Sequence, residues 1–206
     1  PTQTTELDIE LWCYRSDHPP EQGGLGKEGH FRAAFNLMWP NFKWHKWMHM
    51  LIKAWCKHKF ITVIGHTRAS KTYGTAYLIY LDWLADPTRT WASLTTVTFD
   101  GLRNRMWSDL MAAIESAAYP PHGLDVKSTM NAMTVKVDSP SKASERYQIE
   151  GFATSRNKDS AGRIQGKHAG RRRIVLDEAQ ELPDAIYQAE VNASSAPDFK
   201  SVRLAN

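Results

Sequence analysis

The spacing of apolar residues along the chain changes between helical and strand periods, and this order predicts the fold. From Trp44 to Trp55, apolar residues recur every three or four positions, as on one face of an amphipathic helix. The β-branched run at 60–65 then predicts a buried strand. Residues 71–85 have the length and pattern of a helix, which Asp86-Pro87 brings to an end.

The rest of the chain continues this alternation of strands and helices. The other predicted elements are strands at 90–96, 133–137, 146–153, 173–179 and 200–206 and helices at 99–119 and 183–193. Two of these strands, 133–137 and 146–153, are candidates for an antiparallel pair. The alternation predicts an α/β fold, with a mainly parallel central sheet and helices on both faces. Residues 1–35 are a turn-rich lead-in to a single α/β domain at 36–206.

Composition narrows the class of protein but does not identify it. The 206 residues are 42% apolar and 23% charged, as in an ordinary globular domain. A net charge of +4 permits a polyanionic partner without demanding one. Two cysteines, Cys13 and Cys56, indicate no disulfide framework and fit a reducing cytosol. The N-terminus has no secretory signal, and the most apolar stretch is short and carries Asp82, so we expect no membrane span.

Residues 65–72, GHTRASKT, follow a predicted strand and open a predicted helix. They match the phosphate-binding pattern G-x-x-x-x-G-K-[ST], except that Ser70 stands where the second glycine is usual. Backbone N–H groups at a helix start form a nest for anions. We expect Lys71 to reach the β- and γ-phosphates and Thr72 to offer its hydroxyl to magnesium. The candidate phosphate-binding residues are Gly65, His66, Thr67, Arg68, Ala69, Ser70, Lys71 and Thr72.

Two acids, Asp177 and Glu178, follow the apolar strand that begins at Arg173. Carboxylates are costly to bury without a task, and ligands of parallel sheets collect at the carboxyl ends of strands. Asp177 is therefore a candidate to hold magnesium, and Glu178 a candidate to polarise the water that attacks the γ-phosphate. The alternative is that both acids only cap the helix that begins near Pro183.

Phosphoryl transfer also requires a cation for the charge that develops on the γ-phosphate. Arg163, in a glycine-flanked loop before the acids, and Arg68, inside the phosphate loop, are the candidate catalytic arginines. The run Arg171 to Arg173 is more typical of a solvated face or a polyanion contact. Thr95-Thr96, at the end of a predicted strand, is a candidate nucleotide sensor, DNA contact or helix cap.

Four segments give the chain a resemblance to the N-terminal ATPase domain of tailed-phage terminase large subunits, the motors that package viral DNA. GHTRASKT is similar to that family's deviant Walker A motif, and IVLDEAQEL at 174–182 to its Walker B motif. PNFKWHKWM at 40–48 resembles its adenine-binding segment, with Trp44 or His45 as the residue that stacks on the base. SVRLAN at 201–206 resembles its coupling motif, which brings in Asn206.

The resemblance implies a P-loop NTPase fold of the additional-strand, catalytic-glutamate type, with ATP and Mg²⁺ as ligands. The implied activity is ATP hydrolysis that drives double-stranded DNA into a viral capsid, in the cytoplasm of the infected host. The implied partners are double-stranded DNA, the portal protein, the terminase small subunit and further copies of the chain in a pentameric ring. Arg163 would act across the subunit interface of that ring. The family continues into an RNase H-like nuclease domain, so we expect this chain to be the motor half.

Two other functions remain open from the sequence. DEAQ at 177–180 resembles the second motif of DEAD/DEAH helicases, which need a second similar domain. A degenerate nucleotide-binding or DNA-binding module without hydrolysis is the non-enzymatic alternative. Ser70 favours this module, whereas the intact pair Asp177-Glu178 argues against it.

Overall fold

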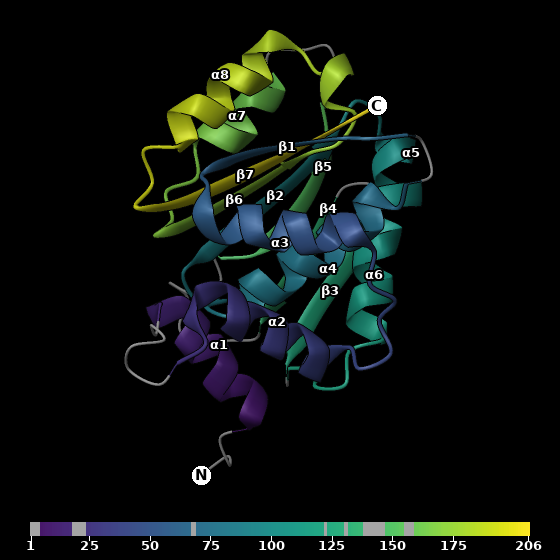
Figure 1. Ribbon diagram of the computed structural model, residues 1–206. Helices are drawn as coiled ribbons and strands as arrows, with labels where there is room; N and C mark the ends of the chain where they lie inside the picture. The colour runs from purple at the N-terminus through teal and green to yellow at the C-terminus, as the bar shows by residue number, and fades with distance from the viewer. Residues whose placement is uncertain are drawn as a thin grey trace.

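A sheet sandwiched between helices forms the centre of the molecule (Figure 1). The computed structural model describes residues 5–17, 24–66, 69–121, 123–129, 132–137, 147–154 and 159–206. Within these residues the sheet has seven strands. From one edge to the other they are β1 (Phe60–Ile64), β7 (Asp198–Ala205), β6 (Arg171–Leu176), β2 (Thr90–Thr96), β5 (Ile149–Ala153), β4 (Ala132–Val137) and β3 (Leu124–Thr129).

The first five strands of this order are parallel to one another. β4 pairs antiparallel with β5, and β3 pairs antiparallel with β4. The predicted α/β fold with a mainly parallel sheet is therefore confirmed. The predicted antiparallel pair is also present, because Met133 of β4 lies opposite Gly151 of β5. Strand β7 lies between β1 and β6, so one additional strand separates the strand before the phosphate loop from the strand before the acids.

Helices cover both faces of this sheet. They are α1 (Glu6–Ser16), α2 (Gly26–Met38), α3 (Lys46–Lys57), α4 (Lys71–Leu84), α5 (Phe99–Gly101), the π-helical η2 (Leu102–Trp107), α6 (Ser108–Glu115), α7 (Asp159–Gln165), the 3₁₀-helical η4 (Ala179–Glu181) and α8 (Asp184–Ala193). Helices α7 and α8 lie on one face, and α3, α4 and α6 lie on the other, with α1 and α2 beyond them (Figure 1). None of the helices in the described ranges is both long and apolar enough to cross a membrane.

Helix α4 is the centre of the larger core. Its residues from Gly74 to Trp83 are all buried, as the nearly continuous apolar run YGTAYLIYLDW suggests. Gly74 permits close packing of α3, because a Cβ there would lie 2.2 Å from the sulfur of Met48 and 2.7 Å from Trp47. The smaller core on the other face joins Phe152, Ile174 and Phe199 of the sheet to α7 and α8.

Three segments differ from the sequence expectation. The lead-in contains α1, whose start is a capping box between Thr5 and Asp8 and whose apolar residues join the large core. The helix predicted at 99–119 ends at Glu115 and contains the wider π-helical segment η2 in its first half. The arginine- and glycine-rich segment before the acids contains α7, because Ile164 is buried against the sheet.

The arginine run that opens β6 is not a solvated face, because all three side chains are at least 95% buried. Successive side chains of a strand point to opposite faces. Arg172 points toward α7 and donates to the Ile164 carbonyl at 3.1 Å. Arg171 and Arg173 point toward α4, where both pair with Asp82. The expectation failed because the partner acid lies 89 or more residues away in the sequence.

Asp82 is the centre of this buried charge cluster. Its Oδ2 lies 2.5 Å from Nε of Arg173, and its Oδ1 lies 3.2 Å from Nη2 of Arg171. Oδ1 also accepts hydrogen bonds from Tyr14 of α1 and from Trp55 of α3. Burial alone would raise the pKa of Asp82, but the two arginines outweigh it and hold the pKa well below its usual value. The cluster therefore joins α1, α3 and α4 to β6.

Replacing Asp82 by asparagine leaves two buried guanidinium groups without their shared carboxylate. We expect Asp82→Asn to lower the free energy of unfolding by about 3–5 kcal/mol, measured by urea denaturation at pH 7. Because the folded-state pKa of Asp82 lies below its unfolded value, its contribution is complete above about pH 4 and is lost as the pH falls further. Asp125→Asn, at an exposed carboxylate of β3, is the control. A loss below about 1 kcal/mol would show that the cluster is not a strong constraint.

Candidate functional site

The phosphate-loop segment connects the edge strand β1 to the N-terminus of α4. Gly65 continues the parallel pairing by donating to the Ala205 carbonyl at 3.2 Å. Ser70 is the N-cap of α4, with φ 56° and ψ 28°, and its side chain makes no capping hydrogen bond. This left-handed backbone is the conformation that favours glycine. Ser70, which stands where the motif usually has glycine, is therefore in a strained backbone conformation. Thr67 and Arg68 lie outside the described residues.

Lys71 bends back over the loop that precedes it. Its Nζ donates to the carbonyls of Gly65 and His66, the latter at 2.9 Å, and to Oδ1 of Asn206 at 3.0 Å. Asn206 in turn donates its backbone N–H to Gln180 Oε1 at 3.4 Å. Asn206 thus connects the loop to the segment that follows the two acids, at the position given by the predicted coupling motif.

Asp177 and Glu178 follow β6 directly. They lie at the carboxyl ends of the parallel strands, which is also the end of β1 from which the loop continues. Asp177 is 5% exposed, and its Oδ2 has no hydrogen-bond partner among the described residues. Burial raises the pKa of this carboxyl. Glu178 is more accessible and has the left-handed backbone φ of 52°. Its Oε2 accepts from the Thr96 hydroxyl at 3.1 Å, so one of the two threonines that end β2 contacts the candidate catalytic acid.

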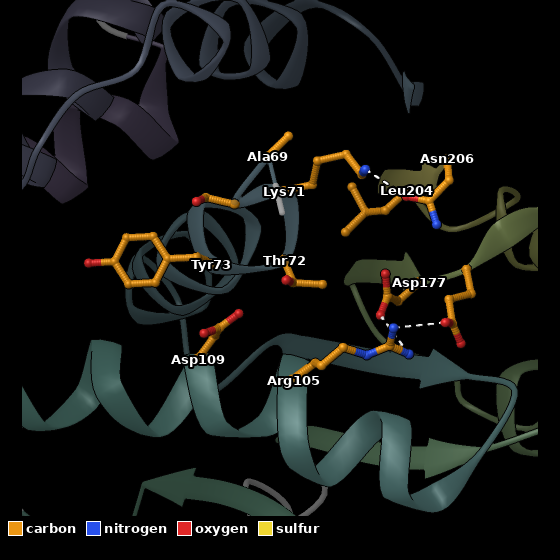
Figure 2. Close-up of a pocket in the computed structure, with 11 residues that line it drawn as sticks. Ala69, Lys71, Thr72, Tyr73, Arg105, Asp109, Asp177, Leu204 and Asn206 are labelled. Atoms are coloured by element: carbon orange, nitrogen blue, oxygen red, sulfur yellow. Dashed lines mark hydrogen bonds and ion pairs between the residues drawn. The ribbon is translucent and has the colours of Figure 1, made fainter. Parts of the chain in front are cut away.

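One cavity of about 520 Å³ brings these groups together. Figure 2 shows Lys71 and Arg105 approaching it from opposite sides, with Thr72 and Asp177 between them. The wall contains residues 69–73 of the loop and α4, Arg105 and Asp109 of the η2–α6 helix, and Asp177, Glu178, Leu204 and Asn206 from the strand ends. The structure therefore joins the two predicted motifs, which are about 100 residues apart in the sequence.

Two residues of this wall, Arg105 and Asp109, are not among the residues predicted from the sequence. Arg105 Nη1 lies 2.7 Å from Glu178 Oε1, and its Nη2 lies 3.8 Å from Asp177 Oδ2. The hydrogen bond with Arg105 lowers the pKa of Glu178. Asp109 lines the same wall as Thr72, and burial raises the pKa of its carboxyl more than the Thr72 side chain lowers it. Their spacing of four was the available signal, but it also describes an ordinary ion pair on a helix surface.

Magnesium is the metal that the motifs imply, and the residues present fit it. No group of three or more histidines, cysteines or acids that could hold a metal occurs within the ranges that the structure describes. Magnesium in nucleotide sites is usually held by one or two protein ligands together with phosphates and water. Asp177, whose Oδ2 makes no hydrogen bond among the described residues, and Thr72 line the same cavity, and their oxygens are a suitable donor set of this kind.

The predicted adenine contacts do not face this cavity. The Trp44 ring stacks on His49 at a centroid distance of 4.8 Å, and its Nε1 donates to Asn36 at 3.2 Å. His45 is exposed at the start of α3. The aromatic residue that lines the cavity is Tyr73, next to Thr72. The amphipathic pattern of the segment did not reveal that the Trp44 ring would pack against His49 and Phe35 of the same chain.

Arg163, the preferred candidate for the catalytic arginine, also lies outside the wall. It is exposed on α7, with its guanidinium 5.6 Å from the centroid of the Phe152 ring. Arg68, the second candidate, belongs to the residues that the structure does not describe. The cation that the structure brings to the acids is Arg105 instead.

No protein-family model and no curated protein matches the sequence. Solved structures do match. The large terminase of the thermophilic bacteriophage D6E aligns with a TM-score of 0.58 and 17% identity, over 80% of this chain and 39% of that one. The large terminase ATPase domain of Thermus phage P74-26 gives a TM-score of 0.58 and 15% identity, over 84% of this chain and 68% of that one. This chain has the fold of a large terminase ATPase domain.

The terminase fold extends beyond these two phages. The HK97 large terminase aligns with a TM-score of 0.55 and 10% identity, over 80% of this chain and 33% of that one. The D6E terminase has been solved in complex with ADP and with ATP-γ-S. The chain spans about two fifths of the D6E large terminase, so the likeness concerns only that share of the protein.

The strain at Ser70 gives a direct test of the loop conformation. We expect Ser70→Gly to raise the free energy of unfolding by about 0.5–1 kcal/mol. Glycine adopts a positive φ without a Cβ clash, and the greater conformational entropy of glycine in the unfolded chain offsets part of this stabilisation. Urea denaturation measures the difference. Ser70→Ala retains the Cβ and is expected to show no gain. Equal stabilities for the glycine and alanine variants would contradict the strained conformation.

Proposed function

We propose that this chain is the ATPase motor domain of a phage terminase large subunit, which hydrolyses ATP to move double-stranded DNA into a viral capsid. The observation that carries the proposal is the shared cavity of Lys71, Thr72, Asp177 and Glu178. A phosphate loop alone would support nucleotide binding, whereas the nearby acid pair supports hydrolysis. The likeness of the fold to large terminase ATPase domains supports the role in packaging.

Each group has a proposed part in the reaction. Backbone N–H groups of residues 65–72 hold the phosphates, and Lys71 leaves its carbonyl partners to pair with the β- and γ-phosphates. Thr72 and Asp177 hold Mg²⁺, which neutralises charge on the phosphates. Glu178 orients the attacking water and draws its proton. Thr96 restrains the Glu178 carboxylate by its hydrogen bond.

For the base, the aromatic residues beside Tyr73 replace Trp44 and His45 in our proposal. Phe42 stacks on Tyr73 with ring centroids 5.6 Å apart and planes 7° apart. A second cavity of about 350 Å³ lies among these two rings, Trp39 and Tyr77, so Tyr73 lines both cavities. An adenine that follows phosphates held at Lys71 would meet this apolar, aromatic surface.

The proposed assembly is a homo-oligomeric ring, a pentamer, with double-stranded DNA, the portal protein and the terminase small subunit as partners in the infected host cytoplasm. An exposed arginine that does not line its own cavity can reach a nucleotide only in a neighbouring copy. The position of Arg163 on α7 therefore supports its proposed action across the subunit interface. The net positive charge supports a DNA partner.

A steady-state ATPase assay tests the central assignment. We expect Glu178→Gln to lose activity by about 100-fold or more while it retains nucleotide affinity, because the amide cannot accept a proton from water. Glu181→Gln, at an exposed acid of η4, is the matched control. Double-stranded DNA should stimulate the wild type. Equal rates for wild type and Glu178→Gln would overturn the assignment, and stimulation by single strands alone would favour a helicase.

The same assay examines Arg163. In Arg163→Ala we expect kcat to fall more than nucleotide affinity, and mixing this variant with Glu178→Gln to restore part of the activity. Restoration follows because each mixed interface can combine an intact arginine with an intact glutamate. Equal losses of kcat and affinity, without restoration on mixing, would contradict action across the interface.

A further inference from the structure

The acids of the candidate site are already paired with a cation of the same chain. Arg105 lies 2.7 Å from Glu178 and 3.8 Å from Asp177, and no other lysine or arginine of the described residues forms an ion pair with either acid. The closer Asp177 oxygen, Oδ2, is the one without a hydrogen-bond partner and the one proposed to hold metal. The Arg105 guanidinium therefore lies next to the oxygen that is proposed to bind the metal.

The segment that carries Arg105 is fixed at its backbone, whereas the Arg105 guanidinium is partly exposed and held by polar contacts, which include a 3.4 Å hydrogen bond from its Nε to the Gly101 carbonyl. Leu102, Met106 and Trp107 of η2 are buried in the large core. The Arg105 side chain is 42% exposed and extends into the cavity. The π-helical turn is wider than an α-helical one, and such turns are frequent at functional sites. The guanidinium can therefore change partners without any movement of the helix.

Both proposed metal ligands have a neighbour on this helix. Arg105 forms an ion pair with Asp177, and Asp109, one turn later, lines the same cavity wall as Thr72. Metal binding at Asp177 must therefore compete with the Arg105 ion pair. A divalent cation and a guanidinium repel one another strongly at about 4 Å, whereas a polyphosphate attracts both.

We infer that Arg105 is the counter-cation of the nucleotide-free site: it holds Asp177 and Glu178 until the metal–nucleotide complex binds, and then transfers its pairing to the phosphates. The inference rests on the proposed function and adds a positioning residue to it. While Arg105 is paired with Glu178, it keeps that carboxylate from acting on water. Transfer of the guanidinium to the phosphates frees Glu178 only when the substrate is in place.

Manganese binding to the nucleotide-free full chain tests the first half of this inference. Mn²⁺ is titrated into the wild type, Arg105→Gln and Arg103→Gln, and free Mn²⁺ is followed by electron paramagnetic resonance. Arg103 is an exposed arginine of the same helical segment and does not line the cavity, so it controls for general charge. We expect Arg105→Gln to bind Mn²⁺ about tenfold more tightly than either. The double variant Arg105→Gln/Asp177→Asn should lose this gain.

Binding of ATP in the presence of EDTA tests the second half. Here Arg105→Gln is expected to bind about tenfold more weakly than Arg103→Gln, because a cation that pairs with phosphates has been removed. The two measurements therefore change in opposite directions for the same variant. Arg105→Lys, which keeps the charge, should stay close to the wild type in both.

Equal Mn²⁺ affinities of Arg105→Gln and Arg103→Gln would overturn the inference, as would ATP binding unchanged by Arg105→Gln. The manganese measurement needs neither nucleotide nor hydrolysis, so it separates this inference from the proposed function. A wild type that binds no ATP would overturn the proposed function, and the Mn²⁺ result would then decide alone whether Arg105 occupies the acids.

Discussion

The buried cluster around Asp82 connects the helix that begins at the phosphate loop to the strand that ends at the two acids. Asp82 lies near the end of α4, and Arg173 lies in β6. Thr72 lies ten positions before Asp82 in the helix, a rise of about 15 Å. Four strand residues separate Arg173 from Asp177, a rise of about 13 Å. Helix and strand thus cover similar distances from a common fixed point, which aligns Thr72 with Asp177 at the other end.

The site contains strained backbone and a buried carboxylate with an incomplete set of hydrogen bonds among the described residues, and the surrounding structure keeps both in place. Ser70 and Glu178, one on each side of the cavity, both have a left-handed backbone. Asp177 is buried, and its Oδ2 has no hydrogen-bond partner among the described residues. Such features cost stability and persist where the neighbouring structure determines them. Here the neighbours are the rigid parallel pairing of β1, β7 and β6 and the deeply buried helix α4.

The sequence predicted those parts of the fold whose signal is local. Strand β1 and helix α4 follow from the residues of each segment alone, and the motif pattern identified Lys71, Thr72, Asp177 and Glu178. Chain order alone does not show that β7 separates the strands before the two motifs; the resemblance implied this additional strand, and the sheet order confirms it. The sequence analysis also missed β3, whose residues are mostly exposed and whose apolar residues are only Leu124 and Val126.

The remaining differences come from partners that are distant in sequence. The arginine run resembled a surface because Asp82 was not recognisable as its partner. Arg105 was one of two similar arginines in a helix, and only the position of that helix beside β6 distinguishes it from Arg103. Trp44 and His45 were both candidates to stack on the base, because the sequence does not show that His49 and Phe35 pack against the Trp44 ring.

The central claim is that the loop after β1 and the acids after β6 form one nucleotide site. A double-mutant cycle of magnesium–ATP affinity, with Lys71→Ala, Asp177→Asn and the double variant, tests it most directly by calorimetry. If both residues act on one bound nucleotide, the two losses will be non-additive, with a coupling energy above about 1 kcal/mol. Losses that add to within about 0.3 kcal/mol, or a Lys71→Ala variant that binds as tightly as the wild type, would contradict a shared site.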